Sequence, residues 1–332
     1  MTTLRTPATR HSRIAGLGAY RPRRGVGNDE ICRRIDSSDE WITTRSGIRV
    51  RGFADKDETL LAMSVEAGAA ALKDAGVDPS QVDCVLVAST SNLVQTPPLS
   101  IAVAHALGAD NAGGFDVSAA CVGFCNGLAV AGDMVSTGNA EHVLVIGVER
   151  MTDIVDPTDR GISFLFADGA GAAVVGPSAT VGIGPVVRGA DGDCLDALSM
   201  TAAWGDFRDD TTLPKPMLRM DGRRVFRWAV SRIADAARQA LAAAGIGIDD
   251  LGAFIPHQAN LRMIDILVDQ LAVPEHVVVS HDVVTTGNTS AASVPLAMTQ
   301  LLADRAVPSG APALLIGFGS GLSYAGQVVL LP

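Results

Sequence analysis

Two stretches of the chain carry apolar residues at helical spacing and end at a glycine. The first runs from Leu60 to Gly76 and the second from Phe226 to Gly245. A glycine after the last periodic residue is typical of a helix C-terminus, because it adopts the left-handed backbone conformation without steric cost. An acidic turn and a short, continuous apolar run follow each stretch, which predicts a buried strand. The pattern therefore predicts one helix–turn–strand unit that occurs twice.

A second pair of segments repeats at almost the same distance along the chain. Two apolar runs end at Gly147 and Gly317, which lie 170 residues apart, and the two helix-ending glycines lie 169 residues apart. Two pairs with nearly equal offsets indicate a duplication with a boundary near residue 180. We therefore expect two halves, 1–180 and 181–332, each alternating strands and helices as α/β layers do.

The segment from Phe115 to Met134 predicts a buried strand, a tight turn of small residues and a helix of about four turns, with Cys121 at the turn. A helix N-terminus carries a partial positive charge that favours the thiolate, which is the nucleophilic form. The alternative, a buried core cysteine, fits this segment alone equally well. With an offset of 169, the position equivalent to Cys121 is Ser290, in a turn that also carries Asn288.

Composition narrows the classes of function. The 332 residues carry a formal net charge of −10, which argues against nucleic acid as a partner. No apolar run reaches the ~20 residues that a membrane-spanning helix needs, so no membrane association is expected. Met1–Arg13 is polar and basic, which predicts a frayed arm and no secretion signal. The five scattered cysteines predict a cytoplasmic protein without disulfides or a metal site.

Four motifs occur in order on this duplicated chain: Asp116–Cys121, Pro256–Asn260, Gly287–Ser293 and Gly317–Gly321. Together they resemble the β-ketoacyl-acyl-carrier-protein synthase III family, the initiating condensing enzymes of the thiolase superfamily, over essentially the whole chain. The resemblance implies an α/β thiolase fold of five αβαβα layers, a homodimer, and no metal or organic cofactor. It implies condensation of a short acyl-CoA primer with malonyl-acyl carrier protein. The products are 3-oxoacyl-acyl carrier protein, CO2 and CoA, formed through an acyl-cysteine.

The resemblance also assigns roles at the reacting centre. Cys121 is the expected nucleophile that carries the acyl group. His257 and Asn288 are expected to donate hydrogen bonds to the second thioester carbonyl, stabilising the enolate left by decarboxylation; His257 must therefore offer an N–H. The backbone N–H groups of Cys121 and Ser320 are expected to form the oxyanion hole of acyl transfer. Taken singly, His257 fits a structural histidine and Asn288 fits a turn residue.

Candidate substrate contacts follow from the same resemblance. Trp41 and Arg45, one turn apart on a predicted helix, are expected to contact the adenine and a phosphate of CoA. Arg160 is expected to stack on the other adenine face, because guanidinium groups both stack and pair with phosphate. Asn260 is expected to contact the pantetheine arm, and Arg262 to meet the acidic carrier protein. The alternative for Trp41 and Arg45 is a surface helix with a half-buried tryptophan. The alternative for Arg262 is a solvated arginine without a partner.

The loop from Thr90 to Pro98 carries a prediction about the primer. In the family this loop closes the far end of the partner subunit's acyl pocket, and acetyl-selective bacterial members place a phenylalanine there. Here the loop contains no aromatic residue, and Thr96 is the candidate for contact with the acyl chain. We therefore expect a four- or five-carbon primer, as in a polyketide-priming member, unless another side chain fills the space.

Other classes of function fit the motifs less well. A thiolase uses a second cysteine as acid and base, but Cys125 lies on the nucleophile's own helix and no cysteine lies near Gly317–Gly321. A hydrolase of the α/β-hydrolase type needs a Gly-x-Ser-x-Gly turn, which the sequence lacks. A non-catalytic module that binds carrier protein would leave the combination of Cys121, His257 and Asn288 unexplained.

Overall fold

The computed structural model describes residues 10–332, so residues 1–9 of the expected arm lie outside the described residues. The expectation of a frayed arm is wrong for His11–Arg13. These residues begin strand β1 (His11–Tyr20), which pairs antiparallel with β7 (Asp168–Ser178) from its first residue. Backbone pairing along this strand fixes a segment whose side chains alone gave no strand signal.

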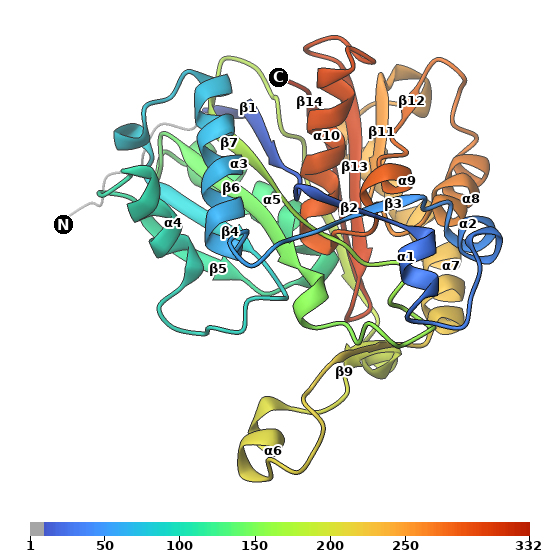
Figure 1. Cartoon of the computed structure of the whole chain (residues 1–332). Coiled ribbons are helices and arrows are strands. Elements are labelled where there is room, and N and C mark those ends of the chain that lie inside the picture. Colours follow the sequence, from blue (N-terminus) through green and yellow to red (C-terminus); the bar gives the residue numbers. More distant parts are fainter. Residues whose placement is uncertain (1–9) are drawn as a thin grey trace.

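Two five-stranded sheets form the body of the molecule (Figure 1). The first has the order β1-β7-β6-β4-β5 and the second the order β12-β11-β13-β14-β8. In both, the two strands at one end are antiparallel to their neighbours and the other three run parallel, so the two sheets have the same topology. The strands not yet located are β4 (Cys84–Ala88), β5 (Gly113–Val117), β6 (Val143–Arg150), β8 (Val187–Ala190), β11 (Ala253–Pro256), β12 (Val278–Val279), β13 (Pro312–Gly319) and β14 (Ser323–Leu330).

Helices complete the five layers, and the expected αβαβα thiolase fold is confirmed. Helices α5 (Gly123–Ser136) and α10 (Ser293–Ala303) contact both sheets and form the central layer with a shared apolar core. Helices α3 (Leu60–Ala75) and α4 (Leu99–Leu107) cover the outer face of the first sheet. Helices α7 (Gly222–Ala244) and α8 (Leu261–Leu271) cover the second sheet.

The two helices predicted from periodicity are present and are capped as their sequences indicate. The Thr59 hydroxyl accepts the N–H of Ala62 at the start of α3, and Asp221 caps α7 in the same way. Gly76 and Gly245 end the two helices with φ of 65° and 72°, in the left-handed region that favours glycine.

The turns before α5 and α10 correct the equivalence expected between the halves. The 3₁₀ turns Ala120–Val122 and Ser290–Ala292 each begin with a left-handed residue, with φ of 45° at Ala120 and 48° at Ser290. The structural offset here is therefore 170, and Ser290 is equivalent to Ala120 rather than to Cys121. An offset taken from helix α3 and its counterpart α7 does not carry across the intervening segments, whose total lengths differ by one residue.

Strand β5 also differs from the expectation of a buried strand. It is the last strand of its sheet, and Phe115 is 44% exposed. Phe115 thus lies at an open edge of the sheet, and sequence periodicity cannot distinguish an edge strand from a buried one.

The remaining shorter elements lie outside the two five-stranded sheets. The segment β2 (Arg24–Gly27), α1 (Asn28–Cys32), α2 (Asp39–Ser46) and β3 (Val50–Phe53) packs into the core beside the second sheet. Helix α9 (Val283–Thr286) contacts β3. Strands β9 (Leu198–Met200) and β10 (Leu218–Met220) bound an excursion carrying α6 (Trp204–Asp209), which projects from the body (Figure 1). The boundary near residue 180 falls between β7 and β8 and stays a prediction as a domain limit.

Across residues 10–332, none of the helices has both the length and the apolar character that spanning a membrane requires.

Candidate active site

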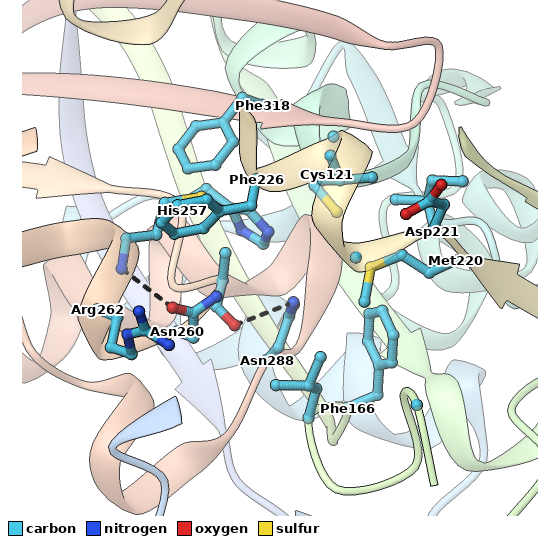
Figure 2. Close-up of a pocket in the computed structure, with 18 of the residues that line it drawn as sticks. Cys121, Phe166, Met220, Asp221, Phe226, His257, Asn260, Arg262, Asn288 and Phe318 are labelled. Carbon is cyan, nitrogen blue, oxygen red and sulfur yellow. Dashed lines mark hydrogen bonds between the residues drawn. The ribbon is translucent and has the colours of Figure 1, made fainter. Parts of the chain in front are cut away.

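Cys121, His257 and Asn288 line one cavity of about 460 Å³. Figure 2 shows the cysteine sulfur, the imidazole ring and the amide group pointing into this space. Cys121 comes from the turn before α5, His257 follows the carboxyl end of β11, and Asn288 precedes the turn before α10. Strand ends and helix starts of both halves therefore converge at the cavity, as expected for a site in an α/β protein.

The Cys121 thiol is held in a close-fitting environment and is only 6% exposed. A Cβ atom at Gly319 would lie 2.9 Å from the Cys121 sulfur, so only glycine at this position leaves room for the thiol. Burial raises the pKa of Cys121 to about 12, while a hydrogen bond to the Ser290 hydroxyl, with 3.4 Å between Sγ and Oγ, acts in the opposite direction. Burial thus opposes the thiolate that the helix N-terminus was expected to favour.

The contact of His257 with Ser293 is the basis for assigning the ring proton. Its Nδ1 lies 2.6 Å from the Ser293 hydroxyl oxygen, which also accepts the backbone N–H of Gln258 at 3.4 Å. The Ser293 hydrogen is thus available to Nδ1, and the ring proton is assigned to Nε2. Burial lowers the pKa of His257 to about 3, so the ring is neutral and offers one N–H, the form that its expected role requires.

The Asn288 side chain is oriented from within its own turn. Its Oδ1 accepts the backbone N–H of Ser290 at 2.9 Å, which identifies the other amide atom as the donor. That NH2 group lies 3.5 Å from the carbonyl oxygen of Ala259 at the cavity wall (Figure 2). Asn288 therefore presents N–H groups on the same side of the cavity as His257.

The residues expected to contact CoA lie together beside the cavity. Arg45 lines it, and the guanidinium groups of Arg45 and Arg160 each lie 4.5 Å from the centre of the Trp41 ring. Phe164 packs against Trp41 edge to face at 5.1 Å. With both arginines stacked on Trp41, an adenine can reach the indole only if one guanidinium moves away.

Asn260 and Arg262 also line the cavity, at the start of α8. The Asn260 side-chain oxygen caps the helix by accepting the N–H of Met263 at 3.0 Å. Arg262 is exposed, with its guanidinium 5.9 Å from the centre of the Phe226 ring. Asn260, the expected pantetheine contact, thus already has a structural role as a helix cap. Arg262, the expected docking residue, lies at the surface.

Four expected residues lie outside the lining of this cavity as residues 10–332 define it: Trp41 and Arg160, which lie beside it, and Ser320 and Thr96. The Ser320 hydroxyl donates to the carbonyl oxygen of Leu198 at 2.7 Å, directly after Gly319. Thr96 is exposed in the loop between β4 and α4. A contact between Thr96 and an acyl chain would therefore require a second copy of the chain.

Sequence reasoning did not identify several aromatic and apolar residues of the cavity. Phe318, which lies between two glycines of the Gly317–Gly321 motif, is edge-on to His257 at 5.3 Å. Phe226 was recognised only as the start of a helix. The further cavity residues labelled in Figure 2 are Phe166, Met220 and Asp221, for which the sequence gave no signal.

No group of three or more His, Cys, Asp and Glu side chains in the described part of the chain is placed to hold a metal ion.

Comparisons with known proteins show the family. The family model for 3-oxoacyl-[acyl-carrier-protein (ACP)] synthase III matches residues 115–192, and the model for the C-terminal part of the same family matches residues 241–331. A β-ketoacyl-[acyl-carrier-protein] synthase III of Streptomyces lividans is 60% identical over 332 residues, which is 100% of this chain and 98% of the relative. A synthase III of Streptomyces coelicolor is 53% identical and covers 97% of both chains.

Two solved structures place the fold in the same group. The crystal structure of the priming β-ketosynthase from the R1128 polyketide biosynthetic pathway matches with a TM-score of 0.99 and 60% identity, covering 100% of this chain and 99% of the other. The 3-oxoacyl-(acyl carrier protein) synthase III of Pseudomonas aeruginosa matches with a TM-score of 0.89 and 35% identity, covering 97% and 99%.

Proposed function

Because the chain belongs to the 3-oxoacyl-[acyl-carrier-protein] synthase III family of condensing enzymes, we propose that Cys121, His257 and Asn288 divide its reaction between acyl transfer and decarboxylation. The observation that carries this proposal is the convergence of a cysteine, a neutral histidine and an oriented asparagine in one cavity. Each has the chemistry that its step needs: a nucleophile for the first step, and two N–H donors for the second.

In the first step, the Cys121 sulfur attacks the carbonyl carbon of the acyl-CoA primer, and CoA leaves. The backbone N–H groups of Cys121 and Ser320 stabilise the oxyanion that forms on the carbonyl oxygen. Gly319, which precedes Ser320, lies against the Cys121 sulfur, so the backbone of this turn is close to the reacting atoms. The donor at Ser320 is a backbone N–H, so it does not depend on the serine side chain.

In the second step, malonyl-acyl carrier protein binds with its thioester oxygen near His257 and Asn288. Loss of CO2 leaves an enolate, and the N–H groups of Nε2 and the Asn288 amide stabilise its negative charge. The enolate carbon then attacks the acyl group on Cys121, which gives 3-oxoacyl-acyl carrier protein and the free enzyme. Protein groups supply the nucleophile and all donors, so the proposal routes no step through a metal or an organic cofactor.

Substrate entry is proposed along the positively charged side of the cavity. Once a guanidinium moves off the indole, Trp41 and Arg160 hold the adenine of CoA, Arg45 lies near its phosphates, and Asn260 lies beside the pantetheine arm. Arg262, exposed at the start of α8, meets the acidic carrier protein. Guanidinium groups suit both tasks because they stack on rings and pair with phosphate and carboxylate groups.

A homodimer is proposed because apolar side chains gather on one exposed face. Leu93 and Val94 in the loop after β4, Ile101 on α4 and Phe115 on β5 are between 40% and 60% exposed. Strand β5 ends its sheet, so a second copy can pair with it and cover this face. Each subunit of the dimer would contain both duplicated halves, 1–180 and 181–332. We also propose that the enzyme acts in the cytoplasm.

For the primer, we propose a short acyl-CoA longer than acetyl-CoA. The loop that carries Thr96 has no aromatic side chain to shorten an acyl pocket. The similarity to a priming β-ketosynthase of a polyketide pathway also favours a role in polyketide priming over a role in fatty-acid initiation.

The division of labour is tested by measuring the two steps separately in His257→Ala and Asn288→Ala. Loss of one oxyanion donor typically lowers a rate by ~10²–10³-fold. Both variants should therefore still accept the acyl group from acyl-CoA. Their release of CO2 from malonyl-acyl carrier protein should be slower by that factor. His276→Ala, which changes an exposed histidine, serves as the matched control. Near-normal CO2 release in both active-site variants would refute the assignment.

A further inference from the structure

Glu149 is a fully buried carboxylate beside the nucleophile that the proposed reaction does not use. It lies near the carboxyl end of β6 and accepts the backbone N–H of Thr90 at 3.1 Å and of Ser91 at 2.9 Å. The Ser91 hydroxyl donates to it at 2.5 Å. A buried carboxylate costs free energy unless it is hydrogen-bonded, so its presence next to a reactive thiol calls for an explanation.

Ser290 and its turn link Cys121 to this carboxylate. The Cys121 thiol donates to the Ser290 hydroxyl oxygen, with 3.4 Å between the two atoms. The Ser290 side chain also lies close enough to Glu149 to lower the pKa of its carboxyl group. The backbone N–H of Ala291, the next residue in the turn, also points at Glu149 Oε1 at 3.5 Å. The thiol hydrogen thus points to Ser290, in a turn whose next N–H points at the carboxylate.

The thiol needs such a proton acceptor. Burial raises the pKa of Cys121 to about 12 and lowers the pKa of His257 to about 3, so near neutral pH the thiol is protonated and the imidazole is a weak base. Burial also raises the pKa of Glu149, which makes this carboxylate a better proton acceptor than an exposed one.

We propose that Glu149, acting through the Ser290 hydroxyl, takes up the proton of Cys121 during acyl transfer and returns it when Cys121 is released. The proposal rests on the proposed role of Cys121 as nucleophile. Ser290 contacts the reacting sulfur directly, whereas Glu149 acts through Ser290.

The proton and electron balance closes over one turnover. As the Cys121 sulfur bonds to the acyl carbon, its proton passes to Ser290 and the Ser290 proton passes to Glu149, which becomes neutral. The carbon–sulfur bond to CoA breaks, and the CoA thiolate takes a proton from water. When the enolate later displaces Cys121 from the acyl carbon, the sulfur leaves with the electron pair and recovers its proton from Glu149 through Ser290.

Two rival roles for Glu149 make different predictions. As an anchor for Thr90 and Ser91, it would affect stability but not the pH dependence of Cys121 reactivity. As a fixed negative charge, it raises the pKa of Cys121, so its removal would make the thiolate easier to form. Only a proton acceptor makes Cys121 less reactive when it is removed.

Within residues 10–332, the other titratable groups near Glu149 have no hydrogen bonds that lead to Cys121. On β6 itself, Arg150 pairs with Asp153. The titratable residues on the elements packed against β6 are Cys84 on β4, Asp168 on β7, Cys125 and Asp133 on α5, and Glu66, Lys73 and Asp74 on α3. Asp168 is fully buried and bonded to Thr152 and Ala54, which makes it a matched control carboxylate.

The test measures alkylation of Cys121 by iodoacetamide between pH 6 and 9 in the full chain, read by mass at the Cys121 peptide. In the wild type the proton moves within the protein, so the rate should change little with pH. In Glu149→Gln and Ser290→Ala the proton must leave to solvent, so the rate should rise about tenfold per pH unit. Acyl transfer from acyl-CoA at pH 7 should fall by ~10²-fold in both variants. Asp168→Asn should keep the wild-type pH dependence.

The outcomes separate the possible failures. Wild-type or faster alkylation and acyl transfer in both variants would overturn the proposal while leaving Cys121 as the acylated residue. Absence of acyl transfer to Cys121 in the wild type would instead contradict the proposed function. Ser290→Ala keeps the bonds of Glu149 to Thr90 and Ser91, and Ala120 already shows alanine in the same left-handed conformation. It therefore serves as the test if Glu149→Gln fails to fold.

Discussion

The charge state of His257 is set by its burial rather than by a charged neighbour. Its ring is 2% exposed, and the removal of water lowers its pKa to about 3. The imidazole of His257 therefore stays neutral across the physiological pH range, and its one ring proton remains available as the Nε2–H donor. Sequence reasoning required an N–H on this ring, but only the contact with Ser293 shows how the tautomer is selected.

This charge state predicts the pH dependence of decarboxylation. Because the pKa of His257 is lowered to about 3, CO2 release from malonyl-acyl carrier protein should show no loss between pH 8 and pH 5 that traces to this residue. The rate would be measured at saturating substrate across that range, with Asn288→Ala as a variant that retains the histidine. An inflection near pH 6.5 in both proteins would contradict the neutral, buried state.

At the scale of elements, strand β5 supports helix α4 from outside the helix. Pro98, which precedes α4, supplies no capping side chain, and Asp116 on β5 accepts the N–H groups of Leu99 at 2.8 Å and Ser100 at 2.9 Å. A carboxylate at a helix N-terminus pairs free N–H groups and interacts favourably with the helix dipole. The motif Asp116–Cys121 thus begins with a residue that holds α4, next to the loop carrying Thr96.

Asp116→Ala should therefore lower the free energy of unfolding by about 1–2 kcal/mol, the usual cost of losing an N-terminal cap. Urea unfolding at a fixed protein concentration measures this, with Asp116→Asn retaining one acceptor and losing less. The exposed Asp110→Ala, just before the same strand, is the control and should change little. Equal stability of Asp116→Ala and the wild type would contradict the capping role.

The elements also show where sequence reasoning reaches its limit. The capped helices α3 and α7 and the turns before α5 and α10 follow from local patterns, because caps and periodicity are local properties. The exposure of Phe115 does not, because it depends on strand order. The one-residue change in offset, which makes Ser290 equivalent to Ala120, depends on loop lengths that periodicity does not record.

At the scale of the whole molecule, the motifs predicted the five-layered fold and the meeting of Cys121, His257 and Asn288. They did not predict the cavity walls, because Phe166 and Met220 come from segments without motifs and reach the site only through the packing of the two halves. They also did not reveal Glu149, which looks like any residue at the end of a strand until Ser290 is placed beside it.

The dimer proposal carries a prediction about the primer. If Thr96 closes the acyl pocket of a second copy, the missing ring leaves room for two or three methylenes, worth about 1–3 kcal/mol in discrimination. kcat/KM should therefore be higher for butyryl- or isobutyryl-CoA than for acetyl-CoA. Thr96→Phe should shift the preference towards acetyl-CoA, and Thr180→Phe, on an exposed turn, should not. A clear wild-type preference for acetyl-CoA would show that the pocket is short.

The central claim is that Cys121 carries the acyl group, and the most direct measurement is the mass of the protein after incubation with butyryl-CoA. We predict one added acyl group per chain, located by peptide mapping at Cys121. The adduct should be absent in Cys121→Ala and retained in Cys125→Ala, because Cys125 is fully buried in the core between the sheets. An adduct that survives Cys121→Ala, or that maps to another residue, would contradict the account.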